Sequence, residues 1–249
     1  MYNPGNNNSF GGGGFGGGRG GGFGSRYQYQ TLPYGYSEAQ SSSLIGKVMG
    51  LLAFSFIFAS LGAFVGIFFL QLTFSTYLFV AIAGLVVLIA LRFLIQKPGL
   101  NLVLLYLFTF LEGLSLAPLL GYYIVSAPYI LGEAFLITAL TSLSLALYSW
   151  TTKRDFTRLG DYLFVGIILL LVAGIVGIFF HSTIFALIIS VVGIAIFSGY
   201  VLYYVQRAKY MADTMPNAIG LTVSLFITIM NLFLYILELL SILQGNRRR

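Results

Sequence analysis

Residues 44–70 read LIGKVMGLLAFSFIFASLGAFVGIFFL, and Lys47 is the one charged residue in this stretch. A helix of this length and composition can cross the roughly 30 Å hydrocarbon core of a bilayer. Further stretches of the same kind follow, separated by short polar breaks. They cover residues 77–95, 102–122, 129–150, 162–180, 183–205 and 218–243. The sequence therefore predicts seven membrane spans.

The composition of the whole chain supports this prediction. Of its 249 residues, 58% are hydrophobic and 8% are charged, whereas an ordinary soluble domain carries roughly 25% charged residues. The apolar stretches lack the alternation of apolar and polar residues that an outer-membrane β-barrel requires. A helix satisfies its backbone hydrogen bonds internally, as hydrocarbon demands. We therefore expect an all-α, polytopic membrane protein built as a bundle of seven helices.

Residues 1–43 differ in composition from the rest of the chain. They are rich in Gly, Asn, Ser and Tyr and include the run Gly11-Gly12-Gly13-Gly14. Aliphatic side chains are too few to offset the entropy of ordering, so we expect a disordered tail ahead of a membrane domain at residues 44–249. The sequence at Arg19 resembles an RNA-binding RGG segment. Because two arginines give little electrostatic attraction, we expect no nucleic-acid partner.

The basic residues outside the spans predict an orientation. Ten Lys and Arg residues lie in the tail, at the entry of the first span and in or next to the second, fourth and sixth breaks, and none lies in the first, third or fifth break. Because basic residues favour the cytoplasmic side, the amino terminus should be cytoplasmic. The ending Arg247-Arg248-Arg249 conflicts with this, since seven full spans would place it outside. Either the last segment crosses completely, or it enters the membrane and returns.

The content of cysteine and histidine excludes several classes of site. Cysteine is absent and His181 is the only histidine. The chain therefore has no disulfide, zinc–thiolate site or iron–sulfur cluster, and a histidine-built metal site is not expected. No acid adjoins His181 to complete a hydrolase site. We expect no catalytic residue, no resident metal and no cofactor.

Glu112 is the clearest candidate for a functional residue, because it lies midway along the span at residues 102–122. A charge in hydrocarbon is expensive, so such an acid either stays protonated or faces a cation or a water-filled cavity. It is either a proton- or cation-sensitive site or a structural acid bonded to a neighbouring helix, with Arg92 or Lys47 nearby. Pro118 follows six residues later and predicts a kink or break in the same span.

The last span carries a second group of polar residues. They share one helical face, and this face should look into the bundle, because lipid offers no hydrogen bonds. The four residues are Thr228, Asn231, Tyr235 and Glu238. Glu238 lies close to the end of the span, so it is alternatively a solvated terminal acid.

Two other patterns are assigned to packing and to the membrane interface. The pairs Gly46/Gly50 and Gly62/Gly66 predict close approach of a neighbouring helix to the first span. Tyr200 and Tyr204 share a face of the sixth span, and the basic Arg207 that follows favours interfacial tyrosines.

Several motifs resemble those of bacterial proteins of the Bax inhibitor 1 family. Residues 148–155 (YSWTTKRD) resemble the family's Y-x-[YW]-T-T-K-R-D loop, and residues 112–118 (EGLSLAP) are similar to its third-span signature. Residues 199–203 (GYVLY), 231–234 (NLFL) and 245–248 (GNRR) are similar to its last two helices and its ending. The resemblance covers residues 44–249.

The resemblance implies a seven-helix bundle with a central last helix, in a bacterial plasma membrane. Members of the family are regarded as pH-sensitive calcium leak channels, as suppressors of cell death in eukaryotes and, in bacteria, as partners of a membrane-bound AAA protease. The family's pH sensor is a pair of aspartates in the last two spans. The matching positions in this chain hold Tyr204 and Thr228.

This substitution changes the expected function. Two nearby carboxylates titrate as a coupled pair, whereas tyrosine ionises near pH 10 and threonine not at all. We expect any leak of Ca²⁺ or another cation to lack the acid-gated switch, with Glu112, Asn231 and Glu238 as candidates for the ion pathway. The alternative is a non-conducting membrane protein that modulates a membrane-bound protease or a stress response. A small-solute transporter ranks last, because only Pro118 interrupts a span, and inverted repeats predict interruptions in matching positions.

Overall fold

The computed structural model describes residues 38–70, 74–179 and 182–247. Within them the chain forms seven long α-helices and a short π-helix, η1, that continues the first of them. The elements are α1 (Glu38–Val65), η1 (Gly66–Leu70), α2 (Phe74–Leu94), α3 (Leu100–Ser126), α4 (Pro128–Thr151), α5 (Leu159–Phe179), α6 (Thr183–Ala208) and α7 (Met215–Arg247). Each α-helix is long and apolar enough to cross a membrane, so the prediction of seven spans is confirmed.

The helices extend beyond the predicted apolar stretches. α1 begins at Glu38, so residues 38–43, which we predicted to belong to the tail, are helical. α3 continues to Ser126 and α6 to Ala208. Polar residues mark where a helix leaves the hydrocarbon core. They do not end the helix, because water can satisfy the backbone groups of its terminal turns. The rest of the predicted tail, residues 1–37, and His181 lie outside the described residues.

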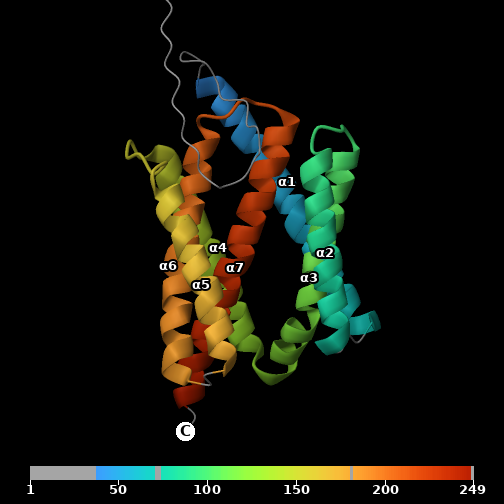
Figure 1. The fold of residues 1–249 in the computed structure, drawn as a ribbon, viewed down its shortest axis with the longest axis vertical. Coiled ribbons are helices and arrows are strands. Elements are labelled where there is room, and N and C mark those ends of the chain that lie inside the picture. Colours follow the sequence, from blue (N-terminus) through green and yellow to red (C-terminus); the bar gives the residue numbers. More distant parts are fainter. Residues whose placement is uncertain (1–37, 71–73, 180–181, 248–249) are drawn as a thin grey trace, which may run out of the picture.

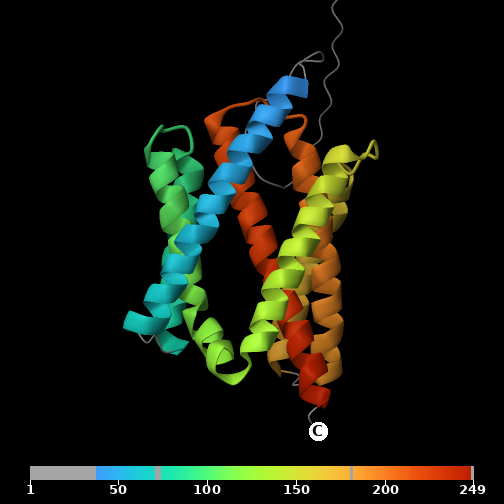
Figure 2. The ribbon, with the colours of Figure 1, turned by 180° about the vertical axis from the view of Figure 1, so that it is seen from behind.

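α7 is the central helix of the bundle. It packs against α1, α3, α4 and α6, and it crosses the middle of the bundle obliquely in both ribbon views (Figures 1 and 2). α2 packs against α3, and α5 packs against α6, so these two helices lie at the periphery. The prediction of a central last helix is therefore confirmed.

α7 crosses the bundle completely. It is one continuous helix from Met215 to Arg247, and its carboxyl end lies at the end of the bundle opposite to the start of α1 (Figures 1 and 2). The alternative in which the last segment enters and returns is wrong. We call the end at which α1 begins the basic end, because it carries the charges of Lys47, Arg92, Lys97, Lys153, Arg154, Arg158, Arg207 and Lys209.

Glycines bring α1 and α3 into close contact. A Cβ atom on Gly62 would lie 2.0 Å from the carbonyl oxygen of Phe110, and one on Gly113 would lie 1.8 Å from that of Ala59. Only glycine permits such an approach of two backbones. The packing role of the Gly62/Gly66 pair is confirmed. The same role for Gly46/Gly50 is wrong, because a Cβ atom there would meet nothing within 4 Å.

α3 remains helical through Pro118. Its last turns bend toward α4 (Figures 1 and 2), as the missing backbone donor of proline allows. The predicted interruption is therefore a change of direction and not a break.

The chain between α4 and α5 is held against the end of α6. Ser149 Oγ donates to the carbonyl oxygen of Leu202 at 2.7 Å. The side-chain amide of Gln206 accepts a hydrogen bond from the backbone N–H of Phe156 and donates to the carbonyl of Arg154. Residues 148–155, which carried the family resemblance, therefore join α4 to α6 at the basic end.

Candidate functional site

A small cavity with polar side chains lies between α2, α5, α6 and α7. Its volume is about 180 Å³. It is lined by Leu88, Arg92, Ile167, Phe197, Tyr200, Tyr204, Arg207, Val223, Ser224, Ile227 and Thr228, and we call it the polar cavity. Among the described residues, the lining contains two guanidinium groups and four hydroxyl groups but no carboxylate.

Tyr204 and Thr228 lie together at this cavity. Thr228 is buried, and its Oγ1 donates to the carbonyl oxygen of Ser224 at 2.7 Å. Tyr204 is half-buried and stacks on Tyr200 with ring centroids 5.5 Å apart. The two positions that match the family's aspartates therefore face the same space. The interpretation of Tyr200 as an interfacial tyrosine is wrong, because its side chain is packed in the bundle with 6% of its surface exposed.

Arg92 and Arg207 are the residues whose contribution to this site the sequence analysis missed. Arg92 lies in the last turn of α2, and Arg207 lies in the last turn of α6. Arg207 Nη1 donates to Tyr203 Oη at 2.8 Å. We considered Arg92 as a neighbour of Glu112 and Arg207 as a mark of the membrane interface, and we predicted no shared site for them. The spacing of three residues between Tyr204 and Arg207, which places them on one helical face, was the available signal.

Glu112 is half-buried between α3 and α2, apart from the polar cavity. Its Oε1 would lie 3.6 Å from a Cβ atom on Gly84 of α2. Arg92 is eight residues further along α2, about 12 Å along the helix axis. Lys47, which we considered as a neighbour of Glu112, is hydrogen-bonded instead to Asp213 at 2.9 Å. The functional role of Glu112 stays a prediction.

The polar face of α7 looks toward α6. The ring of Tyr235 packs on Gly193, where a Cβ atom would lie 2.6 Å from Tyr235 Cγ. Glu238 is half-buried, with the hydroxyl of Ser190 as its polar neighbour on α6. Asn231 Nδ2 donates within α7 to the carbonyl of Ile227 at 2.8 Å.

Four polar residues were predicted to share a face of α7, and of these only Thr228 lines the polar cavity. The structure therefore brings Tyr204 and Thr228 together and leaves Glu112, Asn231 and Glu238 at separate places in the bundle.

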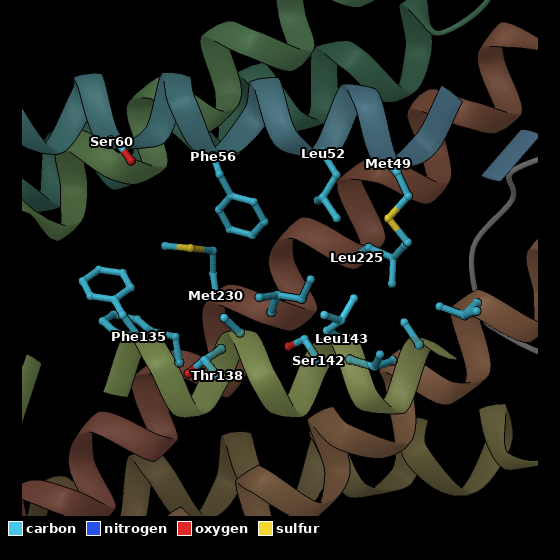
Figure 3. A pocket seen from close by; sticks show the side chains of 16 residues that line it. Met49, Leu52, Phe56, Ser60, Phe135, Thr138, Ser142, Leu143, Leu225 and Met230 are labelled. Carbon is cyan, nitrogen blue, oxygen red and sulfur yellow. The ribbon is translucent and has the colours of Figure 1, made fainter. Parts of the chain in front are cut away.

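A larger cavity lies on the other side of α7, between α1, α4 and α6. Its volume is about 440 Å³, and Figure 3 shows side chains of α1 and α4 facing each other across it. The lining residues, which define the apolar cavity, are Met49, Leu52, Phe56, Ser60, Phe135, Thr138, Ala139, Ser142, Leu143, Ala146, Val201, Val205, Leu225, Ile229, Met230 and Phe233. Of the side chains that the structure describes there, three hydroxyl groups are the only ones with oxygen atoms.

The apolar cavity continues toward the opposite end of the bundle. A neighbouring cavity of about 280 Å³ shares Phe56, Ser60, Phe135, Met230 and Phe233 with it. The wall formed by α1 and η1 therefore reaches from Met49 to Phe68, about 28 Å at the rise of an α-helix. This length is close to the thickness of the hydrocarbon core.

The two cavities differ in the chemistry that they allow. The polar cavity presents positive charge, which attracts anions and repels cations. The apolar cavity presents hydrocarbon, which suits lipid chains or apolar side chains and cannot replace the hydration shell of an ion.

The fold and these cavities define a polytopic helical membrane protein of seven spans. Comparison with known proteins then gives the family. The family model described as "Inhibitor of apoptosis-promoting Bax1" matches residues 41–246, so the chain belongs to the Bax inhibitor 1 family. The resemblance inferred from the motifs is thereby confirmed.

Relatives occur in bacteria and in animals. An uncharacterized membrane protein of Vibrio cholerae is 34% identical over 164 residues, which cover 64% of this chain and 73% of that protein. An uncharacterized protein of Campylobacter jejuni is 36% identical over 212 residues, covering 81% and 89%. Protein lifeguard 4 of Mus musculus is 34% identical over 142 residues, covering 57% and 58%.

Proposed function

We propose that this family member does not leak calcium through the polar cavity and acts by binding other components of the membrane. The observation that carries the proposal is the charge of that cavity: Arg92 and Arg207 line it, and no carboxylate of the described residues does. The positions that match the family's aspartate pair hold Tyr204 and Thr228, which are uncharged at neutral pH.

Electrostatic repulsion opposes a calcium ion at this place. A divalent cation about 8 Å from one guanidinium, at an effective dielectric constant of about 20, is repelled by about 4 kcal/mol. Calcium also prefers six to eight oxygen ligands. In the described part of the chain, the side chains of the apolar cavity offer only the hydroxyls of Ser60, Thr138 and Ser142 as oxygen ligands, so it is not an alternative pathway.

The apolar cavity supports the binding part of the proposal. It leaves an apolar surface between α1 and α4 that a component of the membrane can cover. A membrane-bound protease or a component of a stress response fits a protein that acts by contact. By the distribution of basic residues, the basic end faces the cytoplasm, and the bacterial relatives favour a plasma membrane.

The test is a calcium-flux measurement on the full chain in vesicles loaded with a calcium indicator. We expect the flux at pH 6 and at pH 8 to equal that of protein-free vesicles. A flux above this background that changes steeply between the two pH values would overturn the proposal.

A pH-insensitive cation leak is the second candidate, and the position of Glu112 favours it. Its carboxyl is half-buried midway along α3, and no side chain of the described residues donates a hydrogen bond to it. If this leak exists, Glu112→Gln should reduce the flux to background. The matched control Glu133→Gln removes an exposed acid of α4 and should leave the flux unchanged.

A further inference from the structure

We propose that the apolar cavity holds one acyl chain of a phospholipid, which enters it from the basic end of the bundle. A phospholipid is then the membrane component in the binding part of the proposed function, on which this inference rests. Four features of the cavity support this occupant: its opening, its length, its volume and the side chains beyond its basic end.

The cavity opens sideways onto the surface of the bundle that faces lipid. α1 and α4 both line it, but within the described residues these two helices have no close backbone contact. Figure 2 shows α1 and α4 on the near side of the bundle with α7 between them. Lining residues on both helices are exposed, at 40% for Met49, 51% for Phe135 and 58% for Leu143. A molecule dissolved in the bilayer therefore reaches the cavity without passing through water.

The length of the cavity matches one acyl chain. Its wall on α1 reaches from Met49 to Ser60, and its wall on α4 reaches from Phe135 to Ala146. Each wall is about 16 Å long at the rise of an α-helix. This is about half of the roughly 30 Å hydrocarbon core, which two opposed leaflets make up. Ala146 lies about 8 Å before the end of α4 at Thr151, so a chain enters from the basic end.

The volume of the cavity suits a chain and not a helix. At about 440 Å³ it lies within the range of small-ligand pockets, about 300–1,000 Å³. An α-helix with its side chains is roughly 10–12 Å across. A helix of a partner or of a second copy would therefore cover the opening and leave space behind it. Unfilled apolar space loses the dispersion contacts of its walls, whereas a flexible acyl chain fills the space and restores them.

Trp150 and Lys209 lie about one helical turn beyond the cavity at the basic end. Trp150 follows the lining residue Ala146 by four positions, and Lys209 follows Val205, also a lining residue, by the same spacing. Lys209 Nζ lies 5.5 Å from the centre of the Trp150 ring and donates to the carbonyl oxygen of Ser149 at 2.8 Å. Both contacts are with neutral groups, so the ammonium keeps its positive charge. Tryptophan marks the membrane interface, and a lysine there attracts the phosphate of a lipid headgroup.

The test uses Trp150 as a reporter, because it is the only tryptophan of the chain. The full chain in detergent micelles is titrated with a phosphatidylglycerol whose acyl chains carry bromine, which quenches tryptophan fluorescence. We expect the quenching to saturate at one lipid per chain and to be reversed by unbrominated phosphatidylglycerol. Monoolein has a chain but no phosphate, so it should compete about fivefold more weakly. This comparison needs no change to the protein.

Two substitutions separate the acyl chain from the headgroup. Ala139→Phe fills the cavity from its α4 wall and should weaken the binding of phosphatidylglycerol at least tenfold. Its control Leu140→Phe adds a ring at a neighbouring position that is 57% exposed and not a lining residue, and it should bind as wild type does. Lys209→Gln leaves the cavity intact and should weaken binding about fivefold. Its control Lys153→Gln removes an exposed lysine of the α4–α5 loop and should leave binding unchanged.

Quenching that does not saturate in wild type, or an affinity that Ala139→Phe or Lys209→Gln leaves unchanged, would overturn the inference. A dimer in light scattering that Ala139→Phe dissociates, without saturable quenching, would identify a second copy as the occupant and would overturn it too. The calcium-flux measurement gives a separate answer. Background flux without lipid binding overturns only the phospholipid site, and a calcium leak with lipid binding overturns only the non-conducting part of the proposed function.

Discussion

The polar cavity and the apolar cavity are lined by different faces of the same two helices, α6 and α7. On α6, Tyr204 lines the polar cavity, while the next residue, Val205, lines the apolar one. On α7, Thr228 faces the first cavity and Ile229 the second. One step along a helix turns the side chain by about 100°. Neighbouring residues at nearly the same depth therefore have different environments on these two helices, because they lie on different faces.

The largest expected effect comes from placing the same acid on either side of α6. Tyr204→Asp faces Arg92 and Arg207, so we expect the free energy of unfolding to stay within about 1 kcal/mol of wild type. Val205→Asp places a carboxylate at a position with 2% exposure, against hydrocarbon, and should cost about 3 kcal/mol. Unfolding by SDS titration measures both values. Equal costs at the two positions would show that the cavities do not differ in charge.

The next comparison concerns the helix that bounds the apolar cavity. α1 packs closely on α3 at Gly113, where a Cβ atom would lie 1.8 Å from the carbonyl oxygen of Ala59. Gly113→Ala should therefore push α1 away from α3 and destabilise the fold by about 2 kcal/mol. Gly50→Ala is the matched control, because a Cβ atom there meets nothing within 4 Å. A Gly113→Ala variant as stable as Gly50→Ala, in the same SDS titration, would disprove this contact.

A smaller effect separates two serines of α4. Ser142 lines the apolar cavity, and its Oγ is buried without a hydrogen-bond partner among the described residues. Ser149 Oγ donates to the carbonyl of Leu202. We expect Ser149→Ala to cost about 1 kcal/mol and Ser142→Ala to be neutral or stabilising. If Ser142→Ala proves the more harmful in thermal unfolding, the cavity wall is more polar than described.

The smallest effect concerns Lys47 at the basic end, which is paired with the carboxylate of Asp213. Hydrogen bonds from the Lys47 ammonium hold the pKa of Asp213 below its ordinary value. A carboxyl with a lowered folded-state pKa stabilises the fold above its unfolded pKa, about 3.9, and this contribution is lost as the pH falls through the folded-state value. The pair is partly exposed, with side-chain exposures of 45% and 16%, so it contributes about 0.5 kcal/mol.

Asp213→Asn should therefore lower the unfolding temperature slightly at pH 7. At pH 3 the difference from wild type should be smaller. A difference that grows as the pH falls would show that Asp213 does not act through its charge on Lys47.

Much of the fold was predictable because the bilayer restricts the chain to long apolar helices. The seven long apolar helices follow from residues such as those at 44–70 and 218–243. The sequence left open whether the last of them crosses or returns, and the continuous helix α7 decides it. The start of α1 at Glu38 did not follow, since nothing in apolar content marks where a helix ends in water. The two glycine pairs of α1 look alike in sequence. Only the position of α3 decides that Gly62/Gly66 is a contact and Gly46/Gly50 is not.

The candidate site was predictable only in part. The resemblance paired Tyr204 with Thr228, and both line the polar cavity. Arg92 could not be placed there from sequence, because it comes from α2, which is packed against α3 and reaches the cavity only through the arrangement of the bundle. A residue's own helix gives its face, but the partner across a cavity depends on how the helices pack.

The most direct test of the central claim is calcium flux in vesicles with wild type and the double variant Tyr204→Asp/Thr228→Asp. The account predicts background flux for wild type at pH 6 and pH 8, and a flux that differs several-fold between these pH values for the double variant. This expectation rests on two adjacent carboxylates titrating as a coupled pair beside Arg92 and Arg207. A steep pH response already present in wild type, or one unchanged by the double substitution, would contradict the claim that uncharged side chains have removed the acid-gated switch.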